Sequence, residues 1–138
     1  MGERRKAREL VLQALFFLDV NETDPEQGIQ EFCIQNEDAF TPEITSFFHE
    51  LVNGVLEEKK KIDLLLDKWA KHWKISRMPV VDRNIMRIAV FELIRRPDIP
   101  ATVSINEAVE IGKKFGTRDS GPFINGVLDR IRVQENLE

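Results

Sequence analysis

The segment between Pro79 and Pro97 constrains the fold most, because its apolar residues surround a helix axis almost completely. These residues are Val81, Ile85, Met86, Ile88, Ala89, Val90, Phe91, Leu93 and Ile94. A helix with this pattern must be covered on several sides, so we predict a central helix from Val80 to Arg95. Glu92 would project into the apolar surface between Ile85 and Ile88, and it therefore needs a buried partner.

The rest of the chain also follows a helical period, and no stretch alternates with a period of two. Helix-start signals of the Asp-Pro and Thr-Pro type occur at Asp24 and Thr41. A charged break near residues 57–60 divides one long apolar pattern into two helices or one bent helix. We therefore expect an all-α fold of about seven helices in two packed subdomains, at about 1–57 and 58–138.

The segment from Ser104 to Ile131 is predicted to form a helical hairpin. Ser104 and Glu107 have the spacing of a capping box at the start of its first helix. Gly112 lies on the apolar face, where it indicates close approach of a neighbouring helix. Gly116 is expected to end this helix in a left-handed conformation, and the second helix would begin near Asp119.

The first predicted helix, residues 3–19, carries two apolar side chains on its polar face. At 100° per residue, Leu12 and Phe16 fall opposite the main apolar stripe, together with Arg5 and Glu9. Either a neighbouring loop covers them or they form a protein-binding surface. Cations in a first helical turn oppose the helix dipole, so the charges at residues 4–8 favour a ligand.

Positive charge is concentrated in two short segments of a chain whose net charge is −4. Residues 3–8 hold four cations and one carboxylate, and residues 113–118 hold three cations and no carboxylate. Local basic patches of this kind are typical of polyanion binding, although solvated surface charge is the commoner explanation of any one cluster. Phe115 and Phe123 flank the second patch, where an exposed ring could stack on an unpaired base.

The sequence contains none of the common catalytic or metal-binding patterns, so we expect no enzyme, no cofactor and no metal. His49-Glu50 begins a zinc-protease pattern that lacks its second histidine, and His72 is expected to be a packing residue. The only cysteine, Cys33, has no partner for a disulfide or a metal site. No apolar run is long enough for a membrane helix and no secretory signal is evident, which predicts a cytoplasmic protein.

Three segments resemble the NusB family of bacterial transcription antitermination factors: ERRKARELVLQALF, VDRNIMRIAVFEL and INEAVEIGKKFGTRDSGPFINGVLDRI. The resemblance covers essentially the whole chain. It implies an all-helical protein of two subdomains that binds the boxA element of nascent RNA. It further implies a heterodimer with the ribosomal protein NusE, in a complex that lets RNA polymerase read through terminators, notably in ribosomal RNA operons.

The resemblance also implies roles for individual positions. The Arg-rich start and the last turn would contact RNA through Arg4, Arg5, Lys6, Arg8, Phe115, Asp119, Ser120 and Phe123. Phe16 and Asp82 would contact NusE, and the helical wheel adds Leu12 to that surface.

Two positions depart from the family pattern. Pro122 replaces a residue that is commonly basic, whereas Arg118 supplies a positive charge where an acidic residue is frequent.

Two other functions are compatible with parts of the sequence. One is the NusB-like domain of a ribosomal RNA cytosine methyltransferase, but such enzymes need a separate catalytic domain and the length of 138 residues argues against it. The other is an interaction module that forms a homodimer through the surface around Phe16.

Overall fold

The computed structural model describes residues 2–71 and 73–137, and these residues form seven α-helices and two short 3-10 helices with no strand. The elements are α1 (Glu3–Asn21), α2 (Pro25–Gln35), η1 (Glu37–Ala39), α3 (Pro42–Glu57), α4 (Lys59–Trp69), η2 (Ile75–Arg77), α5 (Val80–Arg95), α6 (Ala101–Phe115) and α7 (Ser120–Gln134). The all-α prediction is confirmed. Within the described residues no helix is long and apolar enough to cross a membrane.

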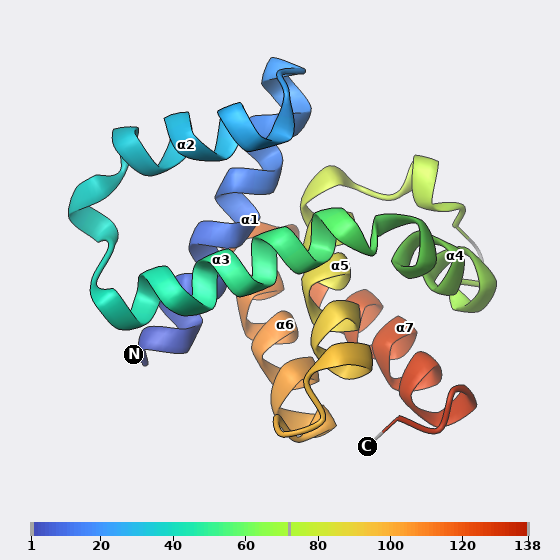
Figure 1. The fold of residues 1–138 in the computed structure, drawn as a ribbon. Coiled ribbons are helices and arrows are strands. Elements are labelled where there is room, and N and C mark those ends of the chain that lie inside the picture. Colours follow the sequence, from blue (N-terminus) through green and yellow to red (C-terminus); the bar gives the residue numbers. More distant parts are fainter. Residues whose placement is uncertain (1, 72, 138) are drawn as a thin grey trace.

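Helix α5 is the centre of the fold, as its sequence predicted. It packs against α1, α3, α4, α6 and α7, and Figure 1 shows it enclosed between α3 on one side and the α6–α7 pair on the other. Its side chains are buried on nearly every side, including those of Ile85, Met86 and Val90. Burial of apolar surface from so many directions stabilises the position of α5 in the core.

Local start signals fix two of the other helix boundaries. The carboxylate of Asp24 accepts a hydrogen bond from the Gln27 N–H at 3.2 Å, and the Thr41 hydroxyl accepts one from the Ile44 N–H at 3.3 Å. These side chains satisfy backbone donors that a helix start leaves unpaired. The expected break near residue 57 is also present, because α3 ends at Glu57 and α4 begins at Lys59.

The expected ends of α6 are wrong in two details. The helix begins at Ala101 directly after Pro100, so Ser104 lies inside it and its hydroxyl bonds to Glu92 instead of capping. Gly116 is not left-handed, with φ −96° and ψ −156°. Glycine is required there for space, because a Cβ atom would lie 2.3 Å from Ser120 Oγ. At Gly112 the expected close approach is confirmed, since a Cβ would lie 2.7 Å from Ile124 Cδ1 in α7.

The helical wheel of α1 predicted the environment of Phe16 correctly but not that of Leu12 or Glu9. Phe16 is 49% exposed, whereas Leu12 and Glu9 are buried. The reason is that α1 is covered from more than one side. It packs on α3 and α5, and the end of α6 also reaches it through Lys114, whose Nζ lies 3.0 Å from Glu9 Oε1.

Candidate nucleic-acid and protein interface

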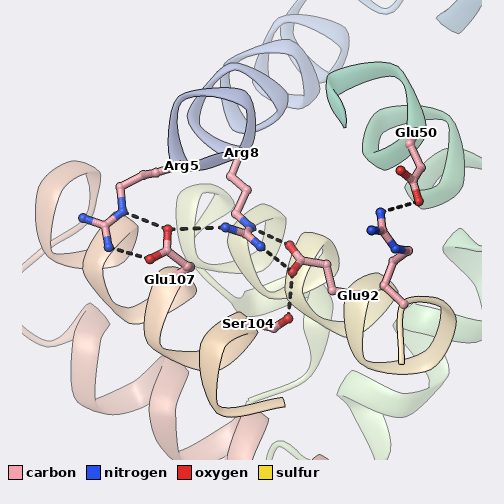
Figure 2. Close-up of polar contacts among 7 residues, drawn as sticks. Arg5, Arg8, Glu50, Glu92, Ser104 and Glu107 are labelled. Carbon is pink, nitrogen blue, oxygen red and sulfur yellow. Dashed lines mark hydrogen bonds and ion pairs between the residues drawn. The ribbon is translucent and has the colours of Figure 1, made fainter. Parts of the chain in front are cut away.

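Arg8 and Glu92 form a buried ion pair between α1 and α5. The two hydrogen bonds are 2.7 Å from Arg8 Nε and 2.8 Å from Arg8 Nη2, and the side chains are only 4% and 1% exposed. Ser104 Oγ donates a third hydrogen bond to Glu92 at 2.7 Å (Figure 2). This is the buried partner that the sequence required for Glu92. Paired geometry and a further donor offset the cost of removing both charges from water.

Arg5 is held next to this pair by Glu107 of α6. Its Nε and Nη2 donate to the two Glu107 oxygens at 2.8 and 2.6 Å, and Arg8 Nη1 reaches Glu107 Oε1 at 3.4 Å (Figure 2). The Arg5 hydrogen bond lowers the pKa of Glu107 below its ordinary value, against the opposing effect of burial. All three guanidinium nitrogens of Arg8 are therefore engaged inside the protein, whereas Arg5 keeps Nη1 free of these carboxylates.

Arg4 belongs to a second group of guanidinium groups, which surrounds the ring of Phe47 in α3. The Arg4, Arg8 and Arg96 Cζ atoms lie 5.0, 5.2 and 5.6 Å from the ring centroid. Cations at this distance are attracted to the face of an aromatic ring. Arg96 also donates to Glu50 and Asp98, and it lowers the pKa of Asp98 to about 2.

An open hollow of about 420 Å³ lies at the start of α1. Its lining residues are Gly2, Arg4, Arg5, Arg8, Val103 and Glu107. Beside it in the sequence, Lys6 is exposed and forms no ion pair with any described residue. The cations that remain available to a ligand here are therefore Arg4, Lys6 and the outer edge of Arg5, while Arg8 supports them from within the protein.

The turn between α6 and α7 holds the second group of predicted RNA-contacting residues. Arg118 and Asp119 are exposed, and Phe115 and Phe123 are half-buried against the core. Ser120 is buried, and its hydroxyl donates a 2.7 Å hydrogen bond to Asp82 Oδ1 while accepting one from the Thr117 N–H at 2.9 Å. The structure thus presents Arg118 and Asp119 to solvent and uses Ser120 to hold the turn on α5.

An apolar groove of about 250 Å³ connects the first helix to this turn. It is lined by Leu12, Gln13, Phe16, Val81, Asn84 and Phe115. The groove brings together Leu12, Phe16 and Phe115, which the sequence singled out separately, and Val81 lies next to Asp82. Sequence reasoning missed Gln13 and Asn84, because their position in the groove depends on how α1, α5 and α6 pack.

The described residues contain no group of three or more His, Cys, Asp or Glu side chains that could hold a metal ion. Burial raises the pKa of the Cys33 thiol, which makes this cysteine a weak nucleophile. His72, expected to be a packing residue, lies outside the described residues.

Comparisons with known proteins identify the family and the fold. A model of the NusB family matches residues 5–132. The transcription antitermination protein NusB of Desulforapulum autotrophicum is 56% identical over 138 residues, which cover 100% of this chain and 96% of the relative. That of Desulfatibacillum aliphaticivorans is 48% identical over 140 residues, covering 100% of this chain and 95% of the relative.

Two solved structures have the same fold. NusB of T. maritima has a TM-score of 0.86 and 36% identity, covering 95% of this chain and 91% of that one. NusB in a crystal structure of antitermination factors NusB and NusE with dsRNA has a TM-score of 0.85 and 25% identity, covering 97% and 98%. From the family match, the high identity over the full length and the shared fold, the chain belongs to the NusB family of transcription antitermination proteins.

Proposed function

We propose that this antitermination factor binds boxA-type single-stranded RNA in nascent ribosomal RNA transcripts together with the ribosomal protein NusE. The complex would act on RNA polymerase and promote read-through of terminators, without a catalytic step. This role requires the bacterial cytoplasm, where nascent RNA is made.

The observation that carries the proposal is the continuity between the apolar groove and the α6–α7 turn. Phe115 lines the groove, and Arg118 follows three residues later on the exposed turn. A protein partner in the groove and an RNA on the turn would therefore be neighbours. The solved complex of NusB and NusE with dsRNA supports this pairing of ligands, because its NusB chain has the same fold as this protein.

On the RNA side, Arg4, Lys6, Arg118 and the open edge of Arg5 would contact phosphates. Arg8 would act indirectly, since its ion pair with Glu92 fixes the helix that carries the other cations. Asp119 immediately precedes α7, whose first backbone N–H groups attract anions, and Phe115 or Phe123 would support a base or shape the turn. Ser120 would contribute by holding this turn in place.

The RNA part is tested by titrating boxA-type RNA and a scrambled control, each with and without NusE. The combined change Arg4→Glu, Lys6→Glu and Arg118→Glu should abolish measurable binding of boxA RNA, because several phosphate contacts are reversed at once. The matched control keeps the charges through Arg4→Lys, Lys6→Arg and Arg118→Lys. If the reversed variant bound boxA RNA as tightly as this control, the proposed RNA surface would be wrong.

On the protein side, Phe16 is the anchor that we propose for NusE, with Leu12 beside it in the groove. Asp82 is buried next in the chain to the groove residue Val81 and would act by holding the α6–α7 turn through Ser120. A half-exposed aromatic ring beside an apolar groove is typical of a protein interface. The same feature also suits a homodimer of the free protein. Light scattering with and without NusE separates the two, since a homodimer that persists in excess NusE would contradict the heterodimer.

A further inference from the structure

Helix α4 and the segment that follows it carry more unbalanced positive charge than the N-terminus does. Residues 59–77 contain seven lysines and arginines but only two carboxylates, Asp63 and Asp67, in a chain whose net charge is −4. Both carboxylates are occupied within the protein. Asp63 pairs with Arg87 at 2.8 Å, and Asp67 accepts a 2.7 Å hydrogen bond from the Ile75 N–H.

Three of these cations lie in the connector between α4 and α5, which we define as the described residues 70–71 and 73–79. Lys71, Lys74 and Arg77 are exposed, and none of them forms an ion pair within 4 Å among the described residues. This differs from the N-terminus, where Arg5 and Arg8 are already paired with Glu107 and Glu92. The connector therefore offers unneutralised charge to a polyanion at a lower desolvation cost.

An exposed aromatic ring lies among these cations. Trp73 is 47% exposed, and it is two residues from Lys71 and adjacent to Lys74, whose backbone is extended at φ −69° and ψ 149°. The other tryptophan, Trp69, is partly buried and donates a hydrogen bond to Glu135 at 2.8 Å. Trp69 is thus explained by packing, whereas nothing in the described part of the chain accounts for the exposure of Trp73.

The connector is anchored to α4 and to the first turn of α5. Its Ile75 is held through the N–H by Asp67 and through the C=O by Arg83 Nη1, at 3.3 Å. Arg83 follows Asp82, which receives the hydrogen bond from Ser120 of the α6–α7 turn. Both segments therefore meet the first turn of α5, and Figure 1 shows the connector leading from α4 to that end of α5.

We propose that the connector is a second contact site for single-stranded RNA, in which Trp73 stacks on a base and Lys71, Lys74 and Arg77 bind the flanking phosphates. An exposed ring at Trp73, followed directly in the chain by an exposed cation at Lys74, offers the combination of base stacking and phosphate contact that binds a single strand. An acidic protein would use the cations but would leave the exposed ring unexplained. The inference extends the proposed RNA binding to a second surface, and it rests on that proposed function.

Tryptophan fluorescence tests the stacking directly, because the chain has two tryptophans and no tyrosine. In a Trp69→Phe variant, Trp73 is the only tryptophan, and titration with oligouridine RNA should quench its fluorescence. Oligouridine contains no boxA sequence, so this result does not depend on sequence-specific binding. Unchanged Trp73 fluorescence at saturating RNA would overturn the proposal.

Affinity for two RNA lengths tests the phosphate contacts. The probes are boxA-type RNA and the same RNA extended by single-stranded uridines at either end. The uridine extension should raise the affinity of the unsubstituted protein about tenfold, and the combined change Lys71→Glu, Lys74→Glu and Arg77→Glu should remove this gain. The same change should reduce the slope of log affinity against log salt concentration by about 2, because each lost phosphate contact contributes about 0.7. Trp73→Ala should weaken binding of the extended RNA by about fivefold or more, and Trp73→Phe should keep most of it.

The matched control for the charge reversal is Lys71→Arg, Lys74→Arg and Arg77→Lys, which should bind like the unsubstituted protein. Thermal unfolding of each variant checks that the fold is intact. Loss of NusE binding with unchanged affinity for extended RNA would make the connector a protein-binding surface and overturn the inference. Failure of the proposed function would appear instead as equal affinity of the unsubstituted protein for boxA-type RNA and for the scrambled control.

Discussion

The Ser120 hydroxyl and the Asp82 carboxylate are joined by a 2.7 Å hydrogen bond, and both side chains are buried. The sequence resemblance assigns these residues to different ligands, Ser120 to RNA and Asp82 to the partner protein. In the folded chain they contact each other. The hydrogen bond fixes the α6–α7 turn on the first turn of α5, where the helix dipole also favours the Asp82 carboxylate.

Ser120→Ala should destabilise the protein by about 1–3 kcal/mol, because it leaves a buried carboxylate without this donor. Urea unfolding measures the change. Ser46→Ala is the matched control, since Ser46 is exposed on α3 and its side chain forms no hydrogen bond with a described residue. This control should stay within about 0.5 kcal/mol of the unsubstituted protein. Equal effects of the two changes would show that the Ser120–Asp82 hydrogen bond does not hold the turn.

Arg8→Ala should lower the unfolding free energy by about 3–5 kcal/mol, because it leaves the Glu92 charge buried without its partner. Replacing both partners, through Arg8→Met with Glu92→Met, should recover most of that loss, since apolar side chains of similar size fill the space. Thermal or urea unfolding of the three proteins gives the comparison. As a control, Lys113→Met removes an exposed pair with Glu110 and should change stability by less than about 1 kcal/mol. A double variant as unstable as Arg8→Ala would contradict this account.

The Arg8–Glu92 pair also bears on the proposed division of the chain into two packed subdomains at the break after Glu57. We propose that this pair and the Arg5–Glu107 pair clamp α1 to α5 and α6. In Arg8→Ala, amide hydrogen exchange should then increase more in α2, which packs mainly on α1, than in α7, which packs on α4, α5 and α6. The same increase in all helices would indicate one cooperative unit.

Much of the fold is predictable from sequence because its signals are local or strongly periodic. The apolar residues around the whole axis of α5 predicted its central position, and the caps at Asp24 and Thr41 predicted two helix starts. Gly112 indicated the close contact with α7. The predicted start of α6 at Ser104 was wrong. Ser104 and Glu107 have the spacing of a capping box, but the helix begins earlier, directly after Pro100. The hydroxyl then becomes available to Glu92, which no local pattern reveals.

The candidate site is less predictable, since it depends on which charges find partners inside the protein. Sequence treats Arg4, Arg5, Lys6 and Arg8 as equivalent, but packing buries Arg8, pairs Arg5 and leaves Lys6 unpaired among the described residues. Leu12 was expected on an open face and is buried, because the end of α6 covers that part of α1. The groove itself arises from three helices distant in sequence.

Acid should weaken the fold through Glu107 and Asp98. Arg5 lowers the pKa of Glu107 below its ordinary 4.5, and Arg96 lowers that of Asp98 from 3.8 to about 2. A carboxyl with a depressed folded pKa stabilises the protein fully above its unfolded pKa. This contribution is lost as the pH falls through the folded value. Unfolding free energy should therefore decline as the pH falls below about 4.5 towards 2.

Glu107→Gln should make this acid-induced decline shallower, which urea midpoints measured across that pH range would detect. Glu110→Gln has the same change in charge at an exposed position of α6 and serves as the control. The explanation fails if Glu107→Gln and the unsubstituted protein lose stability in parallel over the whole range.

Phe16 and Leu12 lie one helical turn apart in the groove, but they should respond differently to truncation. Phe16 is half-exposed, so Phe16→Ala should change the unfolding free energy by less than about 1 kcal/mol, whereas Leu12→Ala should cost about 2–5 kcal/mol. If Phe16 anchors the proposed partner, Phe16→Ala should also weaken NusE binding by about 2 kcal/mol, close to 30-fold. Urea unfolding and NusE titration of both variants supply the measurements. A Phe16→Ala protein that is as unstable as Leu12→Ala but binds NusE normally would mean that the ring serves the fold and not the interface.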